Sequence, residues 1–563
     1  MSAIHQKDAY KIAHKEMYPD NTTFLYSNFT ARSGKNSNIP DSKGVTFIGL
    51  QHVLIDYFIN EWNDTFFNKP KEEVVGKYKR RVTNIVGNVD IGHIEALHDL
   101  GYLPIEIKAL PEGSFVPYGV PMITIKNTHP DFFWVTNMIE SVLSSELWQP
   151  ITSATTYMAY KKLSHKYAEL TGSDKGFIPY QLHDFSFRGM SSRQAAAKSG
   201  FAVLASGSLG TDSIPAVDLA EDYYGANADE EIIGTSIKGT EHSIMCCGTK
   251  EGELETYRRL ITKVVPDGMV AIVSDTWDFW KVVTEYLVEL KPEIMSRDGK
   301  LVIRPDSGDP VDIICGKVFN IIPENHIEYP EHWMKRSLYE YVTDDTPHGV
   351  MGVDEYSDIF KAGDTYIKAT VECDWNRYDK QYYYIDGSRL KSTEEFSPTA
   401  EDKGLIETLW DIFGGTINKA GYKVLDSHIG AIYGDSITYD RAEQIFKRLE
   451  EKGFASSNIT LGIGSYTYQM VTRDTHGFAM KATYATINGE GVEIFKDPVT
   501  DSGIKKSAKG LLMVDKVDGE FVLIQQVSEV QEQLGYLETV FKDGILTKRT
   551  TLKEIRAITN EGF

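Results

Sequence analysis

Short apolar runs that end in a polar or glycine-containing turn recur in the second half of the chain. Each is followed by a stretch of helical character, as in the segments MVAIVSDTWDFW, KLVIRPDSGDP, HIGAIYGDSITYD and NITLGIGSYTYQ. This pattern predicts strand, loop and helix units that follow one another along the chain. Repeated units of this kind are typical of a parallel α/β sheet or barrel.

The stretch after Gly434 gives the clearest helix pattern. Ser436 or Thr438 can cap its N-terminus, and Gly453 can end it. We therefore expect an amphipathic helix between these positions. Its apolar residues fall on one helical face: Ala442, Ile445, Phe446 and Leu449.

The loops after the strands are the expected place for chemistry, because in parallel barrels all strand C-termini open on one face. Any one polar residue in such a loop can equally be a capping or turn residue. Polar residues that recur in the loop after one strand and then after the next favour a functional site. The residues concerned are Asp275, Arg304, Asp306, Asp435 and Gly464.

The stretch from about 322 to 425 differs from its surroundings. It is rich in Tyr, Asp and Gly, as in YVTDDTPHGVMGVDEYSD and WNRYDKQYYYIDGSRL. The dipeptide Asp386-Gly387 favours a tight hairpin turn between β-prone residues. We interpret this stretch as an insertion.

Length and charge limit the function classes. A chain of 563 residues exceeds the usual size of a single core, so two lobes or one barrel with additions are expected. The formal net charge of -22 opposes nonspecific attraction to nucleic acid or to an anionic membrane. A polyanionic ligand would therefore need a local cluster of basic residues.

The start of the chain, MSAIHQKDAYKIAHKEMYPD, lacks the apolar stretch of a signal peptide, and no run elsewhere approaches the length of a membrane span. We expect a cytoplasmic protein. The four cysteines, Cys246, Cys247, Cys315 and Cys373, have no zinc-type spacing. They are expected to be buried structural thiols without chemistry.

The segment QLHDFSFRGMSSRQAA, residues 181–196, places Arg188 beside a turn of small residues that opens a helix. Backbone N–H groups and a guanidinium that point at one anion would form a phosphate site. A surface arginine next to an ordinary capped helix is the alternative.

Two further segments carry candidate residues. In LVIRPDSGDP, Arg304 and Asp306 are two residues apart in an extended loop, so their side chains point to the same side. They could bind sugar hydroxyls and a phosphate, or they could form a structural salt bridge. In KGTEHSIM, His242 could be a packing histidine, or Asp275 could orient its ring and raise its basicity.

Nine segments, in this order along the chain, resemble the nicotinamide phosphoribosyltransferases, which are type II phosphoribosyltransferases. They are DAYKIAHKEMYPDNTTFLYSNF, LHDFSFRG, LGTDSIPA, EHS, VSDTWDFW, IRPDSGDP, YGDSI, LGIGSYTYQMVTRDT and IFKDPVTDSG. The resemblance runs from about residue 8 to 515, apart from the insertion. Nine separated segments with their order kept are far more specific than a single glycine loop.

The resemblance implies an α/β fold, namely an irregular (β/α) barrel packed on an α+β domain built from both chain ends. Residues 1–150 and 476–563 would form the α+β domain, and residues 151–475 the barrel, with the insertion at about 322–425. It also implies a homodimer with two active sites at the subunit interface.

The resemblance further implies the residues that bind the pyridine base. Phe185 and Tyr10 of the partner subunit would stack on the two faces of the ring. Asp212 would accept a hydrogen bond from the carboxamide nitrogen. Arg304 would lie beside the base, and Arg188 would contact the base and phosphates.

Other residues match positions for the sugar and phosphates. Asp306, Gly434 and Asp435 resemble the ribose and metal-side contacts, and Gly464 and Ser465 match the glycine loop for the 5-phosphate. A basic group supplied by the partner subunit would receive phosphates and would meet the need for local positive charge. Its members are Arg473, Lys481 and Lys496 of the partner subunit.

His242 resembles the histidine that this family phosphorylates with ATP, and Asp275 resembles its carboxylate partner. The implied cofactor is Mg²⁺, with Asp275 and Asp306 on the metal side, and ATP is a co-substrate. His242, Asp275 and Asp306 are thus the expected catalytic residues.

The expected function is transfer of the 5-phosphoribosyl group from phosphoribosyl pyrophosphate to nicotinamide, which gives nicotinamide mononucleotide and pyrophosphate for NAD salvage. Nicotinate phosphoribosyltransferase is the nearest alternative, since the two bases differ by one charge. A noncatalytic interaction protein and a phosphate-binding barrel lyase or isomerase are alternatives of other classes.

Overall fold

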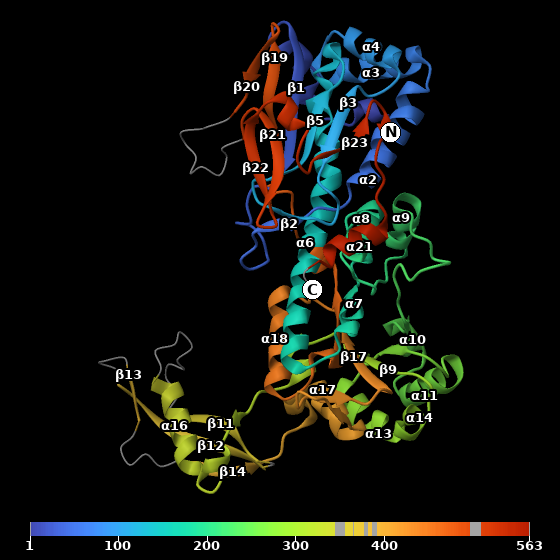
Figure 1. The fold of residues 1–563 in the computed structure, drawn as a ribbon. Helices are drawn as coiled ribbons and strands as arrows, with labels where there is room; N and C mark the ends of the chain where they lie inside the picture. The colour runs from blue at the N-terminus through green and yellow to red at the C-terminus, as the bar shows by residue number, and fades with distance from the viewer. Residues whose placement is uncertain are drawn as a thin grey trace. The chain divides into compact units, whose positions relative to one another are not determined.

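The computed structural model describes residues 2–343, 355–363, 365–376, 381–384, 391–495 and 508–561 (Figure 1). The chain divides into two compact units. Unit 1 comprises residues 1–237, 434–443 and 460–563, and unit 2 comprises residues 238–433 and 444–459.

Unit 1 contains a seven-stranded sheet to which both chain ends contribute (Figure 1). Every neighbouring pair in it is antiparallel. Its strands in spatial order are β20 (Glu490–Glu493), β19 (Ala479–Ile487), β1 (Thr22–Thr30), β5 (Pro121–Asn127), β3 (Ile105–Ala109), β23 (Glu538–Lys542) and β24 (Ile545–Leu546).

One large apolar core joins this sheet to the N-terminal helices. It includes Trp62, Phe66 and Phe541, all fully buried. Helices α3 (Lys71–Val86) and α4 (Gly92–Leu100) each pack an apolar face into it, through Val74, Val75, Tyr78, Val82, Ile94 and Leu97. The other helices of this region are short: α1 (His14–Met17), α2 (Leu50–Val53) and α5 (Val135–Met138).

Unit 1 also holds a short parallel sheet. Strand β18 (Ile459–Ile463) pairs in parallel with β6 (Leu182–Asp184). Parallel bridges then join Asp184 to Thr211 and Gly210 to Thr235. The helices of this part are α6 (Glu140–Thr171), α7 (Ile178–Gln181), α8 (Arg193–Ala205), α9 (Ile214–Tyr224), α19 (Ser465–Tyr468) and α21 (Leu552–Thr559).

Unit 2 is built around four parallel strands in the order β17 (Ile429–Tyr433), β9 (Leu301–Arg304), β8 (Val270–Val273) and β7 (Lys238–Gly239). Strands β17, β9 and β8 are mostly buried, as expected for a parallel sheet covered on both faces. Helices alternate with them: α10 (His242–Cys247), α11 (Glu253–Arg259), α14 (Lys291–Met295), α15 (Pro310–Cys315) and α17 (Ala400–Phe413).

The helix predicted after Gly434 is present as α18 (Tyr439–Glu451). The amide of Arg441 donates to the hydroxyl of Thr438, which therefore serves as the cap. Gly453 follows the helix with a φ of 77°, a conformation that a glycine adopts without strain. All four predicted apolar residues are buried: Ala442, Ile445, Phe446 and Leu449.

The insertion folds around a sheet of its own (Figure 1). Helix α16 (Pro330–Thr343) contributes Met334 and Leu338 to a small separate core with Phe360 and Ala369. The predicted turn at Asp386-Gly387 lies outside the described residues. The strands are β10 (Asn320–Ile321), β11 (Glu355–Ala362), β12 (Thr365–Asn376), β13 (Gln381–Tyr384) and β14 (Ser392–Phe396).

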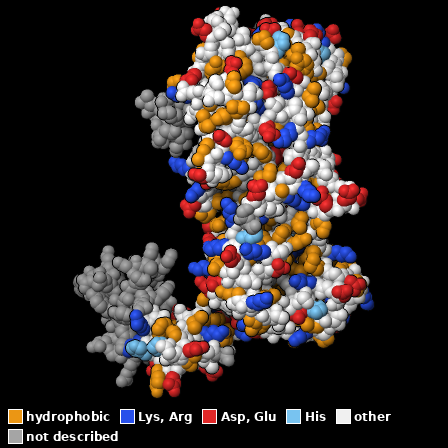
Figure 2. Space-filling view, in the orientation of Figure 1, with side chains coloured by type: hydrophobic (Ala, Val, Ile, Leu, Met, Phe, Trp, Pro, Cys, Tyr) orange, Lys and Arg blue, Asp and Glu red, His pale blue; other side chains and the backbone are white. Residues whose placement is uncertain are grey.

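The predicted α/β class with parallel strands is confirmed. The domain boundaries at 150 and 475 stay a prediction, since the contact-based units group residues 151–237 with the chain ends. Of the helices described, including α6 with its 32 residues, none is both long and apolar enough to cross a bilayer. Acidic and basic side chains are interspersed on the face drawn in Figure 2.

A buried ion pair links the antiparallel sheet to α20 (Glu529–Glu532). Lys108 Nζ lies 3.0 Å from Glu532 Oε2, and the two side chains are only 5% and 3% exposed. Lys126 approaches the same carboxylate at 3.4 Å, and the Tyr26 hydroxyl donates to its other oxygen. Removal of the Glu532 carboxylate would leave the Lys108 ammonium group buried without its ion-pair partner.

We predict that Glu532→Ala lowers the free energy of unfolding of unit 1 by about 3–5 kcal/mol, because Lys108 would stay buried without a counter-ion. The double variant Lys108→Met with Glu532→Leu should recover most of this loss. Denaturant unfolding followed by tryptophan fluorescence measures both. Asp99→Ala, which removes the exposed partner of Lys71, is the control and should have no measurable effect. A double variant as unstable as the sum of its single variants would contradict the prediction.

Candidate active site

Phe185 directly follows β6, and its N–H donates to the carbonyl of Ile463 in β18 (3.0 Å). Its half-buried ring lies against the backbone of Gly462, where an added Cβ would overlap ring carbon atoms. The same Cβ would lie 2.7 Å from the Cα of Gly434. Gly462 therefore gives the aromatic ring room at the end of the strand.

Asp184, the last residue of β6, is fully buried. Its carboxylate accepts the N–H of Ser186 (2.9 Å) and the hydroxyl of Thr211 (3.4 Å). Burial raises the pKa of Asp184, and the hydrogen bonds from Ser186 oppose this shift. The carboxylate thereby fixes the loops that follow two neighbouring strand segments.

Asp212 lies in the second of these loops. Its Oδ1 accepts a hydrogen bond from His183 Nε2 (2.9 Å) and another from the Ser236 hydroxyl (2.5 Å). The His183 and Phe185 rings lie 4.8 Å apart between centroids. A half-exposed carboxylate is thus held, in a defined orientation, within the same small group of residues as the Phe185 ring.

Arg188 lies in the turn Phe187–Gly189 and is exposed. A Cβ at Gly189 would overlap the Ser465 hydroxyl, so this turn touches the loop after β18. The N–H of Ser191 donates to Gln469 Oε1 (2.9 Å), which joins the two loops a second time. The predicted phosphate residues of these two loops therefore lie together.

Gly464 and Ser465 begin the short helix α19. The first amides of a helix have no intrahelical acceptor, so they are available to an anion. A Cβ at Gly464 would have only the carbonyl oxygen of Gly434 within 4.0 Å, which leaves the space beside it open. Asp435 follows Gly434 and is exposed.

In unit 2, Asp275 follows β8 and Asp306 follows β9. The N–H of Asp306 donates to Asp275 Oδ2 (3.0 Å). The side chain of Asp275 is almost fully buried, and its Oδ1 accepts no hydrogen bond from any described residue. An acceptor of this kind fits a cation or a donor supplied by a ligand.

His242 is the first residue of α10. Its Nδ1 lies 3.2 Å from the Thr276 hydroxyl, and its Nε2 lies 3.9 Å from Asp275 Oδ1. The side chain is 49% exposed, so His242 is not a core packing residue. The structure brings His242 and Asp275 close together, as predicted, although not into direct hydrogen bonding.

Arg304 Nη2 lies 3.7 Å from Asp306 Oδ2, so the two residues form an ion pair. The Nε atom of Arg304 is buried and, among the described residues, has no acceptor. The salt bridge considered as an alternative is therefore present, but it leaves part of the guanidinium without a partner.

The residues expected to serve the partner subunit lie on the surface of unit 1. Tyr10 is 64% exposed, with its ring 5.2 Å from that of His14. Arg473 and Lys481 are also exposed. Lys496 lies outside the described residues. Their contribution to a second subunit's site stays a prediction.

Among the described residues, no three His, Cys, Asp or Glu side chains lie close enough together to hold a metal ion on their own. The pair formed by Asp275 and Asp306 still fits Mg²⁺. This ion is commonly held by one or two carboxylates together with substrate phosphates. The unpartnered Asp275 Oδ1 is the observation that supports this fit.

The expectation for the cysteines is partly wrong. Cys315 is buried, and burial raises the pKa of its thiol to about 12. Cys246 and Cys247 are exposed and unpaired, because α10 presents both on its outer side.

Sequence reasoning overlooked the residues that orient the candidate side chains. His183 and Ser236 donate to Asp212, and Gly462 and Gly189 allow close approach of neighbouring loops. His183 sits inside LHDFSFRG, one residue before Asp184, so the motif itself contained the signal. Ser236 has no such signal, since only the parallel bridge at Thr235 places it at a strand end.

Comparisons with known proteins identify the family of the chain. The model of the nicotinate phosphoribosyltransferase (NAPRTase) family matches residues 180–361 and 369–545. The chain belongs to this family. The matched ranges contain eight of the nine segments and every candidate residue except Tyr10, and the first segment precedes residue 180.

Similar proteins from four bacteria are named nicotinamide phosphoribosyltransferase. The protein of Acinetobacter baylyi is 45% identical over 567 residues, covering 99% of this chain and 96% of its own. That of Mycoplasma pneumoniae is 30% identical over 511 residues, covering 88% and 92%. The crystal structure of nicotinate-nucleotide pyrophosphorylase from Pyrococcus furiosus is 11% identical with a TM-score of 0.51, covers 100% of this chain and 95% of its own, and supports the fold.

We predict that Gly462→Ala damages the candidate site, because the added Cβ would displace the Phe185 ring and the backbone at Gly434. The KM for the pyridine base should rise on the order of tenfold or more, as misplacement of a binding group does. The KM for the phosphorylated substrate should change less. Gly76→Ala is the control, since nothing lies within 4 Å of a Cβ there. Equal kinetics for the two variants would contradict the prediction.

Proposed function

We propose that this protein transfers the 5-phosphoribosyl group of phosphoribosyl pyrophosphate to nicotinamide, forming nicotinamide mononucleotide and pyrophosphate in cytoplasmic NAD salvage. The observation that carries this proposal is the oriented carboxylate of Asp212 in the group that holds the Phe185 ring. Family membership supports the reaction, and the names of the similar bacterial proteins support the amide as the base.

The Phe185 ring offers a flat face for a pyridine ring. The Asp212 carboxylate can only accept hydrogen bonds, so it suits the NH₂ group of an amide and repels the carboxylate of nicotinate. His183 and Ser236 both donate to Oδ1 and hold the group in place. Orientation is the main contribution of this set, because the ring nitrogen is already a nucleophile.

The joined loops at Gly189 and Ser465 would hold the 5-phosphate through their amides and the hydroxyl of Ser465. The guanidinium of Arg188 adds charge-assisted hydrogen bonds to the same kind of oxygen. Asp435 follows Gly434 and would accept hydrogen bonds from the ribose hydroxyls. Together these groups would fix the sugar while its C1 loses pyrophosphate.

Asp275 and Asp306 would hold Mg²⁺ together with the pyrophosphate oxygens. When bound, the ion supplies positive charge that stabilises the departing group. Arg304, whose Nε has no acceptor in the described structure, would add a donor to the reacting centre. Stabilisation of the leaving group is the largest single contribution that we expect from the protein.

ATP would be used as a co-substrate through phosphorylation of His242. The attacking nitrogen is Nε2 or Nδ1 of the neutral ring, the bond to the γ-phosphoryl group forms, and the bond to the ADP oxygen breaks. The half-exposed position of His242 leaves the ring open to a nucleotide, and the buried Asp275 nearby would stabilise the cationic ring. Hydrolysis of the phosphohistidine would then couple to product formation.

A homodimer with shared sites is the assembly that we propose. Exposed Tyr10, Arg473 and Lys481 support it, because each is a residue type that binds an aromatic base or phosphate and none is buried within its own subunit.

Nicotinate phosphoribosyltransferase is the second candidate. The name of the family model favours it, and the Asp212 carboxylate disfavours it. Incubation of the purified chain with Mg²⁺, phosphoribosyl pyrophosphate and one base at a time, followed by chromatography and pyrophosphate detection, tests the proposed reaction. We expect one pyrophosphate per nicotinamide mononucleotide. No nucleotide product with either base would refute the enzyme assignment.

We predict that the unmodified protein prefers nicotinamide over nicotinate on the order of 100-fold or more in kcat/KM, because two like charges in a partly desolvated pocket repel. Asp212→Asn should narrow this ratio, since its Oδ1 can still accept from His183 and Ser236 while the repulsion is gone. Asp212→Ala should bind nicotinamide more weakly and should gain little affinity for nicotinate. Asp218→Asn, the same change at an exposed position of α9, is the control. An unchanged ratio in Asp212→Asn would remove Asp212 from specificity.

We predict that His242→Ala abolishes ATP hydrolysis and acid-labile labelling from γ-labelled ATP but keeps part of the base turnover, since the groups for the leaving pyrophosphate lie elsewhere. His428→Ala is the matched control. His428 also faces a carboxylate, with Nδ1 2.6 Å from Asp426 Oδ1, and has no assigned role. Labelling that persists in His242→Ala, or is lost in His428→Ala, would contradict the prediction.

A further inference from the structure

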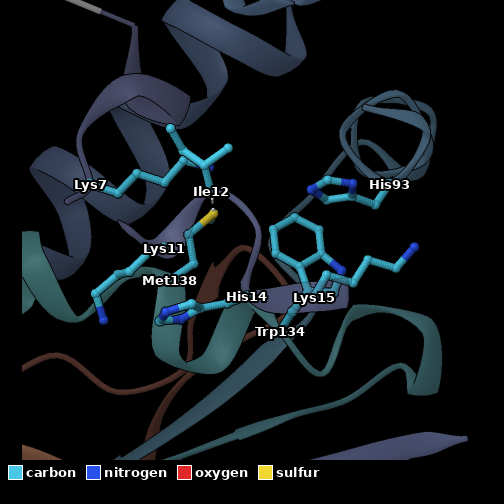
Figure 3. A pocket seen from close by; sticks show the side chains of 8 residues that line it. All are labelled: Lys7, Lys11, Ile12, His14, Lys15, His93, Trp134 and Met138. Atoms are coloured by element: carbon cyan, nitrogen blue, oxygen red, sulfur yellow. Dashed lines mark hydrogen bonds between the residues drawn. The ribbon is translucent and has the colours of Figure 1, made fainter. Parts of the chain in front are cut away.

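Cationic side chains inside unit 1 hold backbone carbonyls as well as carboxylates. At the small hollow drawn in Figure 3, Lys11 Nζ donates to the carbonyl of Asn137 (2.9 Å) and pairs with Glu140 (2.6 Å). The hollow itself, about 10 Å³ in volume, has room for about one water molecule. Lys11 therefore fixes the path of the chain. The C-terminal helix α21 carries a second cation that binds backbone in this way.

Arg556 of α21 binds backbone carbonyls from two separate segments. Its Nε donates to the carbonyl of Leu204, near the end of α8 (3.0 Å). Its Nη2 donates to the carbonyls of Ser208 (3.3 Å) and Ile233 (2.5 Å). All three carbonyls belong to buried residues. The guanidinium is a rigid fork with several N–H donors, so it can span these carbonyls at once.

Helix α21 is seated where the last turn of α8 needs donors. The final carbonyls of a helix have no following amides, so they require partners from outside it. The Thr559 hydroxyl donates to the carbonyl of Ala205 (3.2 Å). On its apolar side, α21 buries Leu552 and Ile555 in the same core as Ile233. The helix therefore supports the loop that follows α8 from both its polar and its apolar side.

The two segments joined by the guanidinium pair with each other on the way to the candidate base site. The N–H of Thr235 donates to the carbonyl of Leu209 (2.6 Å), and the N–H of Thr211 donates to the carbonyl of Thr235 (3.0 Å). The next residue of each segment is Asp212 or Ser236, and the Ser236 hydroxyl donates to Asp212 Oδ1. The guanidinium thus closes one end of a short ladder whose other end is the contact between Asp212 and Ser236.

The second segment has little regular structure of its own. Between α9 and β7, residues 225–237 form turns and extended chain with a single parallel bridge at Thr235. The place of Ser236 therefore depends on how Ile233 is held, through its side chain in the core and its carbonyl on Arg556.

We propose that Arg556 is a positioning residue for base selection. By tying Ser208 to Ile233, it keeps the ladder in register and so aims the Asp212 carboxylate. This inference rests on the proposed function, in which Asp212 accepts a hydrogen bond from the amide of nicotinamide. Arg556 acts through backbone carbonyls, so its loss changes how Asp212 is held and leaves the groups that face the substrate in place.

Kinetics with the two bases test the effect on selection. Arg556→Gln should lower the ratio of kcat/KM for nicotinamide over nicotinate on the order of tenfold, because a displaced carboxylate loses the amide and repels the acid less. The KM for nicotinamide should rise more than that for phosphoribosyl pyrophosphate, since other contacts join the loops at Gly189 and Ser465. A merely structural loss would lower the activity with both bases equally and leave the ratio unchanged.

Two further variants calibrate this result. Arg556→Lys keeps the charge but offers one nitrogen to the three carbonyls, so it should recover part of the ratio. Arg549→Gln makes the same change at an exposed arginine shortly before α21 and should leave the ratio unchanged. An unchanged ratio in Arg556→Gln would overturn the proposal.

A double-variant cycle tests the route through Asp212. If Arg556 acts by aiming this carboxylate, Arg556→Gln should change the base ratio much less in the Asp212→Asn background than in the unmodified protein. Effects that simply multiply would show independent action and would overturn the proposal.

Hydrogen exchange of the full chain measures the clamp without catalysis. The amides of Thr211 and Thr235 should exchange on the order of tenfold faster in Arg556→Gln, and Arg556→Lys should show a smaller change in the same direction. Amides of α3 should keep their rates, which shows that the rest of unit 1 is folded. Unchanged exchange at Thr211 and Thr235 would overturn the proposal. If the unmodified protein showed no preference for nicotinamide, the proposed function would fail, and the exchange rates would still decide whether Arg556 holds the ladder.

Discussion

A buried carboxylate at the end of a parallel strand is the constraint on which the candidate site depends in each unit. Asp184 follows β6 and accepts from Ser186 and Thr211, and Asp275 follows β8 and accepts the N–H of Asp306. Each carboxylate pulls together loops that follow neighbouring strands. Burial of a carboxylate costs free energy, and the hydrogen bonds offset that cost only while their donors stay in place. The carboxylates therefore hold the loops in one arrangement.

This arrangement explains how a polar site can be ready before substrate binds. In unit 1 the fixed loops carry the Phe185 ring, the Asp212 carboxylate and the joined turns at Gly189 and Ser465. In unit 2 they carry Arg304 and Asp306 beside His242. Groups that are already oriented require little reorganisation when charge develops on departing pyrophosphate, which is how such sites lower a barrier.

Local sequence patterns predicted helix α18 and several of the residues at the strand ends. The periodicity of α18 and the cap at Thr438 follow from short-range rules, and strand-end residues such as Asp275 and Asp306 follow from the parallel fold. Tertiary contacts without a local signature were not predictable. Ser236 reaches Asp212 only because a single bridge aligns distant segments, and the exposure of Cys246 and Cys247 depends on which side of α10 packs.

The most direct test of the account is a competition between the two bases in one vessel. The purified chain receives phosphoribosyl pyrophosphate, Mg²⁺ and equal concentrations of nicotinamide and nicotinate, and the two mononucleotides are separated and quantified together with pyrophosphate. The account predicts nicotinamide mononucleotide as nearly the sole nucleotide, formed in equal amount to pyrophosphate. Predominant nicotinate mononucleotide, or nucleotide formation without pyrophosphate, would contradict it.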